Sequence, residues 1–329
     1  MSDTVLVTGG AGYIGSHTVL QLIERGHRVV VLDNLSTGFR QLVSPSAELV
    51  VGNISDQSFV QKIIRDQAVS AVIHFAASLD VAESVTNPLK YYWNNVAGTT
   101  ALLTACAAEK IKTFIFSSTC AVYGTPSRNP VDEQLRVQPQ SPYGRTKFMV
   151  ESAIRDLASA DPKFRFIILR YFNVAGAHTR GLIGPLNPSP THLLGVACQT
   201  ALGLRTSFPV YGSDYPTEDG TCVRDFIHVD DLADAHILAL NYLKGGGDSQ
   251  TFNCGYGRGF SVLEVLKALE KVTGKNMPVT YETRRPGDIT EIYANPTHIK
   301  SVLHWTPKFD DLEIICRTAF DWMQRIANK

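Results

Sequence analysis

The sequence predicts an α/β protein in which a doubly wound parallel sheet is followed by a smaller, less regular α/β domain. Two observations support this fold class. Short apolar runs rich in β-branched residues alternate with helix-length segments over roughly the first half of the chain, and polar residues do not alternate within these runs. Such strands are typical of a parallel sheet that helices cover on both faces. Glycine and proline become frequent after Asn173, where the less regular region begins.

Each expected element follows from one of these patterns. Six strands are expected, at residues 5–7, 28–32, 49–51, 71–75, 113–116 and 166–169. Helical periodicity separates them, at residues 14–25, 58–67, 89–109 and 143–159. Four further helices are expected, at residues 193–201, 230–243, 262–272 and 312–326. We therefore expect one domain at residues 1–173 and a second at 174–329, with the segment near 225–243 packing back on the first.

The composition limits the classes of protein to which the chain could belong. Its 31 Lys and Arg residues balance 31 Asp and Glu residues, so a surface for nucleic acid or anionic membranes is not expected. Apolar residues make up 44% of the 329 positions, and no stretch reaches the ~18 uninterrupted apolar residues of a membrane span. No secretory signal is recognisable, so we expect a cytoplasmic protein. Six scattered cysteines lack the spacing of zinc sites, so neither a metal nor a disulfide is expected.

A glycine-rich motif directly follows the first expected strand. Gly9, Gly12 and Gly15 stand at the mouth of the helix expected at residues 14–25. Glycines permit a tight turn, let the backbone approach a pyrophosphate, and leave the N–H groups of the helix N-terminus facing its negative charge. A glycine pattern alone also occurs in ordinary turns. Its position between a strand and a helix favours a Rossmann-type dinucleotide site.

Asp33 strengthens this interpretation because it follows the second expected strand. A carboxylate at that position accepts hydrogen bonds from the adenosine ribose hydroxyls and repels a 2′-phosphate, which favours NAD over NADP. The alternative is that Asp33 only caps a turn. The order strand, glycine loop, helix, strand and aspartate favours NAD binding.

A second motif predicts acid–base chemistry. Tyr143 and Lys147 form a Tyr-x-x-x-Lys pattern and share a helix face, while Thr119 stands at a strand end upstream. Alone, such a pair usually marks a solvated helix face. A tyrosine base needs roughly 4 kcal/mol of stabilisation at pH 7, since its free pKa is near 10. The Lys147 ammonium and a positive nicotinamide ring would lower that pKa, and the Thr119 hydroxyl would relay or hold the proton. The pattern thus indicates alcohol deprotonation coupled to hydride transfer.

With these motifs the chain resembles the UDP-glucose 4-epimerases of the extended short-chain dehydrogenase/reductase superfamily. The resemblance covers nearly the whole chain and rests on residues 9–15, 73–77, 91–95, 117–124, 141–147, 169–177, 215–229 and 284–288. It implies that Tyr143 removes the proton of the sugar 4-hydroxyl while the C4 hydride goes to tightly held NAD⁺. The 4-keto sugar would then turn over, and the returning hydride would invert C4.

The resemblance also implies a set of binding residues. The residues expected to bind NAD are Gly9, Gly12, Tyr13, Ile14, Gly15, Asp33, Asn34, Asn53, Ile54, Phe75, Ala76, Ala77, Asn94, Ser117, Tyr143, Lys147 and Phe172. Those expected to bind the UDP-sugar are Thr119, Tyr143, Asn173, His192, Leu193, Tyr211, Arg224, Arg285, Asp288 and Ile292. Arg224 and Arg285 are assigned to the diphosphate and Tyr211 to the uracil; surface charge is the alternative for the arginines. Residues 1–173 would then bind NAD and residues 174–329 the UDP-sugar. A homodimer through the helices at 89–109 and 143–159 is expected.

Four positions differ from residues found in many or some members of the family, and a fifth bears on substrate choice. Thr119 replaces a serine, and Asn53 replaces an aspartate that accepts from the adenine amino group. Leu79 and His192 stand where some relatives carry lysine and asparagine. The resemblance implies that the bulk of the residue at position 292, here Ile292, decides whether an N-acetyl group fits beside the sugar. We expect UDP-glucose and UDP-galactose as the main pair, with weak activity on N-acetylated sugars.

Other functions stay open at this point. A UDP-N-acetylglucosamine or UDP-pentose 4-epimerase would use the same chemistry. A nucleotide-sugar dehydratase or decarboxylase needs an added carboxylate near Thr119, where the sequence has Cys120, Ala121 and Val122. A non-catalytic NAD-binding sensor could lose Tyr143 or Lys147 without losing its fold, yet both are present.

Overall fold

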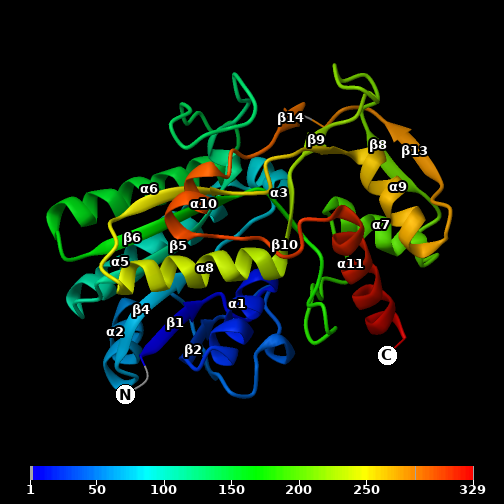
Figure 1. The fold of residues 1–329 in the computed structure, drawn as a ribbon. Helices are drawn as coiled ribbons and strands as arrows, with labels where there is room; N and C mark the ends of the chain where they lie inside the picture. Colours follow the sequence, from blue (N-terminus) through cyan, green and yellow to red (C-terminus); the bar gives the residue numbers. More distant parts are fainter. Residues whose placement is uncertain (1–2, 286, 329) are drawn as a thin grey trace.

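The computed structural model describes residues 3–285 and 287–328 of the chain. Pro286, part of the motif at 284–288, lies outside the described residues, as do Met1, Ser2 and Lys329. A parallel sheet of seven strands forms the centre, in the order β11-β6-β5-β4-β1-β2-β3 (Figure 1). The strands are β1 (Thr4–Thr8), β2 (Arg28–Asp33), β3 (Glu48–Val51), β4 (Val69–His74), β5 (Thr113–Thr119), β6 (Arg165–Tyr171) and β11 (Gln250–Cys254). The predicted α/β class with a parallel sheet is confirmed.

Helices cover both faces of this sheet, because alternate strand residues point to opposite sides. In β1, Val5 and Val7 enter one apolar core and Leu6 enters the other. The first core is covered by α1 (Tyr13–Glu24) and α8 (Val229–Lys244), and the second by α2 (Gln57–Asp66), α5 (Gly98–Ala108) and α6 (Pro142–Ala160). Figure 1 shows α8 running across the sheet above α1. Uniformly apolar strands are thus explained by burial on both sides.

The helix expected at residues 89–109 is divided into three segments. These are α4 (Pro88–Tyr91), the π-helical segment η2 (Tyr92–Ala97) and α5, and α3 (Val81–Thr86) precedes them. The wider π turn carries Asn95, which is 1% exposed. Its side chain accepts from Ser78 N (2.8 Å) and donates to Ser78 O (3.0 Å). The π segment therefore positions a residue that holds the loop after β4, a frequent use of such segments.

The second region is built from short strands and four helices. Its small sheets pair β7 (Asn173–Ala175) with β10 (Phe226–His228), β8 (Phe208–Tyr211) with β13 (Val279–Glu282), and β9 (Val223–Arg224) with both β12 (Phe260–Ser261) and β14 (Glu291–Ile292). Its helices are α7 (Leu193–Ala201), α9 (Val262–Thr273), α10 (Thr297–Leu303) and α11 (Leu312–Ala327). The segment 176–192 connects β7 to α7 without a helix or strand. Two short 3₁₀ helices, η1 (Arg40–Leu42) and η3 (Cys120–Val122), belong to the first region.

Two elements from beyond residue 173, one strand and one helix, pack with the large sheet and its helices. Strand β11 extends it beside β6, and α8 packs beside α1. Sequence analysis did not identify β11. The division of the chain at residues 173 and 174 stays a prediction, because the two regions interleave at these elements. Among the described residues, no helix is long and apolar enough to cross a membrane.

A third apolar cluster lies where the two regions meet. It joins Val122 and Tyr123, which follow β5, to Phe172 after β6 and to Ile292 in β14. The segment that bears Ile292 is therefore packed against the carboxyl ends of the sheet strands, where ligands of open α/β sheets bind.

Candidate active site

The glycine loop after β1 is packed so tightly that larger side chains would collide with its own backbone or with the backbone of the loop after β4. Gly9 has a φ of +74°, and a Cβ there would lie 2.6 Å from Ala76 N. A Cβ on Gly15 would lie 2.3 Å from Gly9 O. Gly12 is the N-cap of α1 and has no capping side chain. The first N–H groups of α1 are therefore available to an anionic group, as a dinucleotide pyrophosphate requires.

Asp33 holds this loop from the end of β2. Its carboxylate accepts from Ala11 N (3.0 Å) and Leu35 N (2.8 Å), and the residue is buried. These two bonds orient the carboxylate and leave acceptor capacity for ribose hydroxyls. Nearby, Asn34 and Asn53 use their side-chain oxygens to accept from Ser36 N and Ser55 N, while Ile54 is buried in the second core. The Asp33 carboxylate and the glycine cradle fit NAD, whose ribose hydroxyls Asp33 would accept from and whose pyrophosphate the first N–H groups of α1 would hold.

The loop after β4 supplies a second wall of this site. A Cβ on Gly9 would meet Phe75 and Ala76 within 3 Å, so the two loops touch. The backbone N–H groups of Phe75 and Ala76 both donate to Thr8 O. Asn94 donates to Asn95 Oδ1 (3.0 Å), and Asn95 fixes Ser78 beyond Ala77. The predicted residues Phe75, Ala76, Ala77 and Asn94 are thus gathered beside the glycine loop.

The three predicted reacting residues come together at the junction of β5 and α6. Ser141 caps α6 by accepting from Gly144 N (3.1 Å), and Pro142 occupies the first turn. This start places Tyr143 and Lys147 on the buried face, where they are 7% and 3% exposed. Lys147 Nζ donates to Ser117 O (2.8 Å) and lies 4.8 Å from the centre of the Phe116 ring. Thr119 ends β5 and contacts Tyr143 through its side chain.

Burial dominates the electrostatics of this junction. It raises the pKa of Tyr143 above its usual range; the neighbouring Tyr171 raises it further, and the Thr119 side chain lowers it. Burial lowers the pKa of Lys147 to about 7, against the opposing influence of Glu151. The chain by itself therefore does not produce the lowered Tyr143 pKa expected from the sequence, because desolvation dominates when the positive nicotinamide charge is not counted. Both groups are strongly perturbed, as is common for catalytic groups.

The expected sugar and nucleotide residues surround the small sheet β12-β9-β14. Arg224 in β9 pairs with Ile292 in β14, and Arg224 Nη2 lies 3.9 Å from Asp288 Oδ1. The Asn173 N–H donates to Asp225 O, which attaches β7 to this sheet. Ile292 is 1% exposed and packs in the third apolar cluster with Phe172. Arg224, Asp288, Ile292 and Asn173 are thus brought to one side of the sheet ends.

Four other predicted substrate residues, and Tyr13 of the predicted NAD set, have roles of their own in the fold. The Arg285 guanidinium lies 3.8 Å from the centre of the Tyr211 ring, so the two residues stack on each other. This contact covers one face of the ring expected to stack on uracil. His192 is the N-cap of α7 and accepts from Gly195 N (3.1 Å), and Leu193 begins that helix. Tyr13 donates to Gly176 O (2.6 Å), which fastens α1 to the segment after β7.

Sequence reasoning missed residues that support this site from behind. Glu151 lies one turn beyond Lys147, is fully buried, and accepts from Ser118 Oγ (2.6 Å). Asn95 and Ser78 connect the β4 loop to α6 through Thr146. The sequence did contain a signal for Glu151. A residue four positions after Lys147 lies on the same face of α6, so a charged residue there is expected to be buried beside Lys147.

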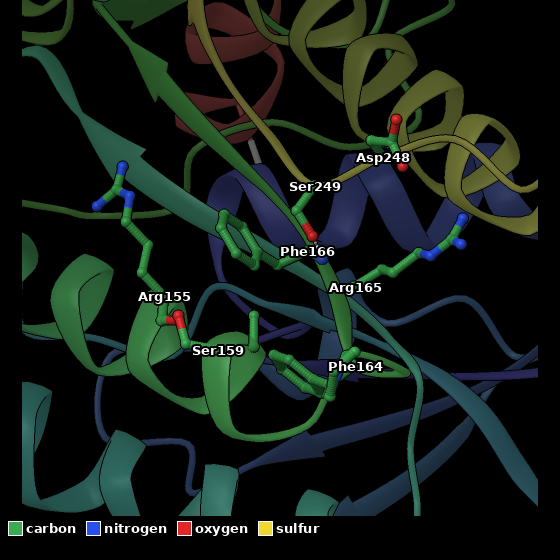
Figure 2. Close-up of a pocket in the computed structure, with 9 residues that line it drawn as sticks. Arg155, Ser159, Phe164, Arg165, Phe166, Asp248 and Ser249 are labelled. Carbon is green, nitrogen blue, oxygen red and sulfur yellow. Dashed lines mark hydrogen bonds between the residues drawn. The ribbon is translucent and has the colours of Figure 1, made fainter.

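A groove of about 420 Å³ lies elsewhere, where β6 begins and the chain enters β11 (Figure 2). It is lined by residues that include Arg155, Phe164, Phe166 and Ser249. Since Thr119 and Phe172 lie at the carboxyl ends of their strands, this groove is at the opposite edge of the sheet. None of the predicted site residues lines this groove. The junction of β5 and α6 therefore stays the candidate active site.

Comparison with known proteins decides the family. A family model described as the NAD dependent epimerase/dehydratase family matches residues 5–255. The chain belongs to this family. NAD is accordingly its cofactor, as the glycine loop and Asp33 predicted.

Similar proteins extend the comparison over the whole chain. A UDP-glucose 4-epimerase of Azospirillum brasilense is 49% identical over 321 residues, covering 98% of this chain and 92% of the relative. The structure of UDP-glucose 4-epimerase from Brucella ovis in complex with NAD is 45% identical, with a TM-score of 0.94 and coverage of 97% and 98%. The UDP-Glc/GlcNAc 4-epimerase of Campylobacter jejuni is 44% identical, with a TM-score of 0.86 and coverage of 98% and 100%. The predicted resemblance to the UDP-glucose 4-epimerases is confirmed.

Proposed function

We propose that this chain is a UDP-glucose 4-epimerase that interconverts UDP-galactose and UDP-glucose. The observation that carries the proposal is the convergence of Tyr143, Lys147 and Thr119 at the junction of β5 and α6, beside a glycine loop suited to NAD. Full-length similarity to curated UDP-glucose 4-epimerases supports it.

In the proposed reaction, the chain's own groups move one proton and hold the sugar nucleotide. Tyr143 takes the proton of the 4-hydroxyl, and Thr119, in contact with its side chain, holds that hydroxyl in line. The Lys147 ammonium stabilises the tyrosinate that this transfer requires. NAD⁺, when bound, supplies the acceptor for the hydride from C4. Because a 4-keto sugar is planar at C4, return of the hydride to the opposite face of C4, with the proton passing from Tyr143 back to O4, would give the epimer.

The second region anchors the UDP part in this proposal. Arg224 and Arg285 neutralise the diphosphate, with Asp288 within ion-pair range of Arg224. Asn173, His192, Leu193 and Tyr211 complete the nucleotide site. The Arg285 guanidinium lies against one face of the Tyr211 ring, so uracil would take the other face or displace Arg285. Anchoring through UDP leaves the sugar free to turn, which inversion at C4 requires.

We also propose that the working unit is a homodimer. Large apolar side chains are exposed on packed neighbouring segments: Leu89 on α4 is 77% exposed, Trp93 on η2 is 75% exposed, and Met149 on α6 is 47% exposed. Such a patch marks an interaction surface, and a second copy of the chain is the occupant predicted from the sequence. Location in the cytoplasm stays a prediction from the sequence.

The decisive experiment omits added NAD. The purified chain is incubated with UDP-galactose, the reaction is stopped, and UDP-glucose is measured afterwards with UDP-glucose dehydrogenase. Conversion establishes epimerisation together with retained cofactor. Conversion of only UDP-N-acetylhexosamines or UDP-pentoses, followed by chromatography, would overturn the substrate assignment and leave the chemistry. Absence of all conversion even with NAD⁺ added would favour a non-catalytic NAD-binding protein.

A further inference from the structure

A buried cluster of charges lies behind Lys147. Glu151 follows Lys147 by one helical turn on α6, so the two side chains share a face. The Glu151 side chain is fully buried. Its carboxylate accepts from Arg170 Nε (3.0 Å) and Nη2 (2.6 Å) and from the more exposed Arg155 (3.2 Å). These contacts keep a carboxylate in the sheet–helix interface where an apolar residue would otherwise pack.

Three consecutive residues at the end of β5 connect this carboxylate to the reacting groups. The Ser117 carbonyl accepts from Lys147 Nζ, the Ser118 hydroxyl donates to Glu151 Oε1, and the Thr119 side chain contacts Tyr143. A change at Glu151 therefore reaches the end of β5 as well as α6.

The Lys147 ammonium needs a counter-charge because it is almost completely buried. Its direct contacts, the Ser117 carbonyl and the Phe116 ring, carry no net charge. His74 on β4 faces it as a neutral group, since burial lowers the His74 pKa to about 3. Glu151 is the acid that raises the pKa of Lys147 against its burial. Arg170 on β6 and Arg155 on α6 face Glu151 and offset part of its charge.

We propose that Glu151 is a positioning residue that keeps Lys147 in its ammonium form and fixes the end of β5 for the tyrosine base. This inference rests on the proposed epimerisation. Arg170 acts in the opposite sense, because its cation weakens the field of Glu151 at Lys147. Arg155 closes the outer side of the cluster, and Figure 2 shows its side chain extending away from the aromatic residues that line the groove.

Two substitutions that are expected to shift the pH dependence of kcat in opposite directions test the proposal. Glu151→Gln removes the counter-charge, so the alkaline limb of the kcat profile, which reports proton loss from Lys147, is expected to move at least about one pH unit lower. The maximal kcat is expected to fall about tenfold or more. Arg170→Met removes the cation that offsets the charge of Glu151. The carboxylate then stabilises the Lys147 ammonium more strongly, so the alkaline limb is expected to move to higher pH. Asp156→Asn removes an exposed carboxylate of the same helix and is the matched control, with no expected shift.

Further variants separate this role from structural support. In a Lys147→Met background, Glu151→Gln is expected to cause little further loss of kcat, because the lysine through which Glu151 acts is already absent. Shifts of the limb in the same direction for Glu151→Gln and Arg170→Met, or a full added loss in the Lys147→Met background, would overturn the proposal. If Glu151→Gln does not fold, the charge-balanced pair Glu151→Gln with Arg170→Met replaces it, with a smaller expected downward shift, because the opposing Arg170 cation is lost as well; an upward shift in this pair would overturn the proposal.

A readout independent of turnover distinguishes this inference from the proposed function. Ultraviolet difference titration follows tyrosinate formation in the NAD-loaded protein, and subtraction of the matching Tyr143→Phe variant isolates Tyr143. In Glu151→Gln, Tyr143 is expected to ionise at a higher pH, because Lys147 no longer stabilises the anion. An unchanged Tyr143 titration would reject the role of Glu151. Failure of the unaltered chain to convert UDP-galactose would reject the epimerase function, and this titration would still decide the role of Glu151.

Discussion

The side-chain nitrogen of Lys147 lies 2.8 Å from the carbonyl oxygen of Ser117, so the lysine of α6 is tied to the strand that ends in Thr119. This contact holds the cation at the edge of the sheet, one helical turn from Tyr143 on the same face. The lysine and the threonine therefore approach Tyr143 from two elements that cannot move independently.

Replacement of Tyr143 by phenylalanine tests the assigned base. We expect kcat to fall about 10²–10⁴-fold, since the group that accepts the proton is lost. The melting temperature and bound NAD, measured after denaturation of the protein, are expected to stay unchanged. A loss of less than about tenfold would show that another group acts as the base.

Replacement of Ile292 by tyrosine tests the proposed control of substrate size. Ile292 is buried beside Arg224 in the β9–β14 pair, so added bulk reduces the space next to the sugar. The ratio of turnover with UDP-N-acetylglucosamine to turnover with UDP-glucose is expected to fall about tenfold or more, and to rise in Ile292→Ala. Product chromatography with both substrates measures this ratio, and equal ratios in the three proteins would refute the assignment.

Replacement of Trp93 by aspartate tests the proposed homodimer. A charge in place of this exposed indole is expected to convert the dimer to a monomer, as measured by analytical ultracentrifugation. Exposed Leu204 follows α7 and belongs to none of α4, η2 and α6, and Leu204→Asp provides the control that should stay dimeric. A monomeric unaltered chain would contradict the proposal directly.

Buried histidines predict loss of stability in acid. Burial lowers the pKa of His74 to about 3, and the values for His228 and His236 to about 4. The unfolded chain therefore binds more protons below pH ~6.5, so the free energy of unfolding falls as pH falls from there towards the folded values. Each group contributes a slope of about 1.4 kcal/mol per pH unit within that window.

Urea unfolding between pH 7 and pH 5 measures this slope. His74 contacts Thr8 Oγ1 (2.6 Å) and Thr99 Oγ1 (2.8 Å), and His74→Asn is expected to reduce the slope by about one proton. Exposed His304 is the control position, where the same His→Asn change removes a histidine without removing a buried imidazole. An identical slope in His74→Asn would mean that His74 does not contribute to acid sensitivity.

The elements that sequence reasoning predicted best are those with a strong local pattern. The strands ending near Asp33 and Thr119 are apolar and β-branched, and α6 has a clear start at Ser141 and Pro142. The glycine loop, Asp33 and the Tyr143–Lys147 pair could be predicted because each depends on residues close in sequence.

Features that depend on distant residues could not be predicted in this way. Strand β11 contains Asn253, a polar residue that is fully buried because Tyr123 donates to it and it donates to Val131 O. From the local sequence, burial of this amide is expected to be unfavourable, because the partners that offset its desolvation are distant in sequence. The Arg285–Tyr211 stack and the π turn that carries Asn95 depend on tertiary contacts in the same manner.

The position of β11 bears on how the chain reaches its folded state. The sheet edge beside β6 is completed only by Gln250–Cys254, and one apolar face of the sheet is covered by α8, residues Val229–Lys244. During synthesis, a nascent chain that has not yet passed these residues exposes both an open strand edge and an uncovered apolar face, each a site for wrong association. We therefore expect residues 1–173 and the later residues to fold as one cooperative unit, and a truncation after residue 173 to aggregate.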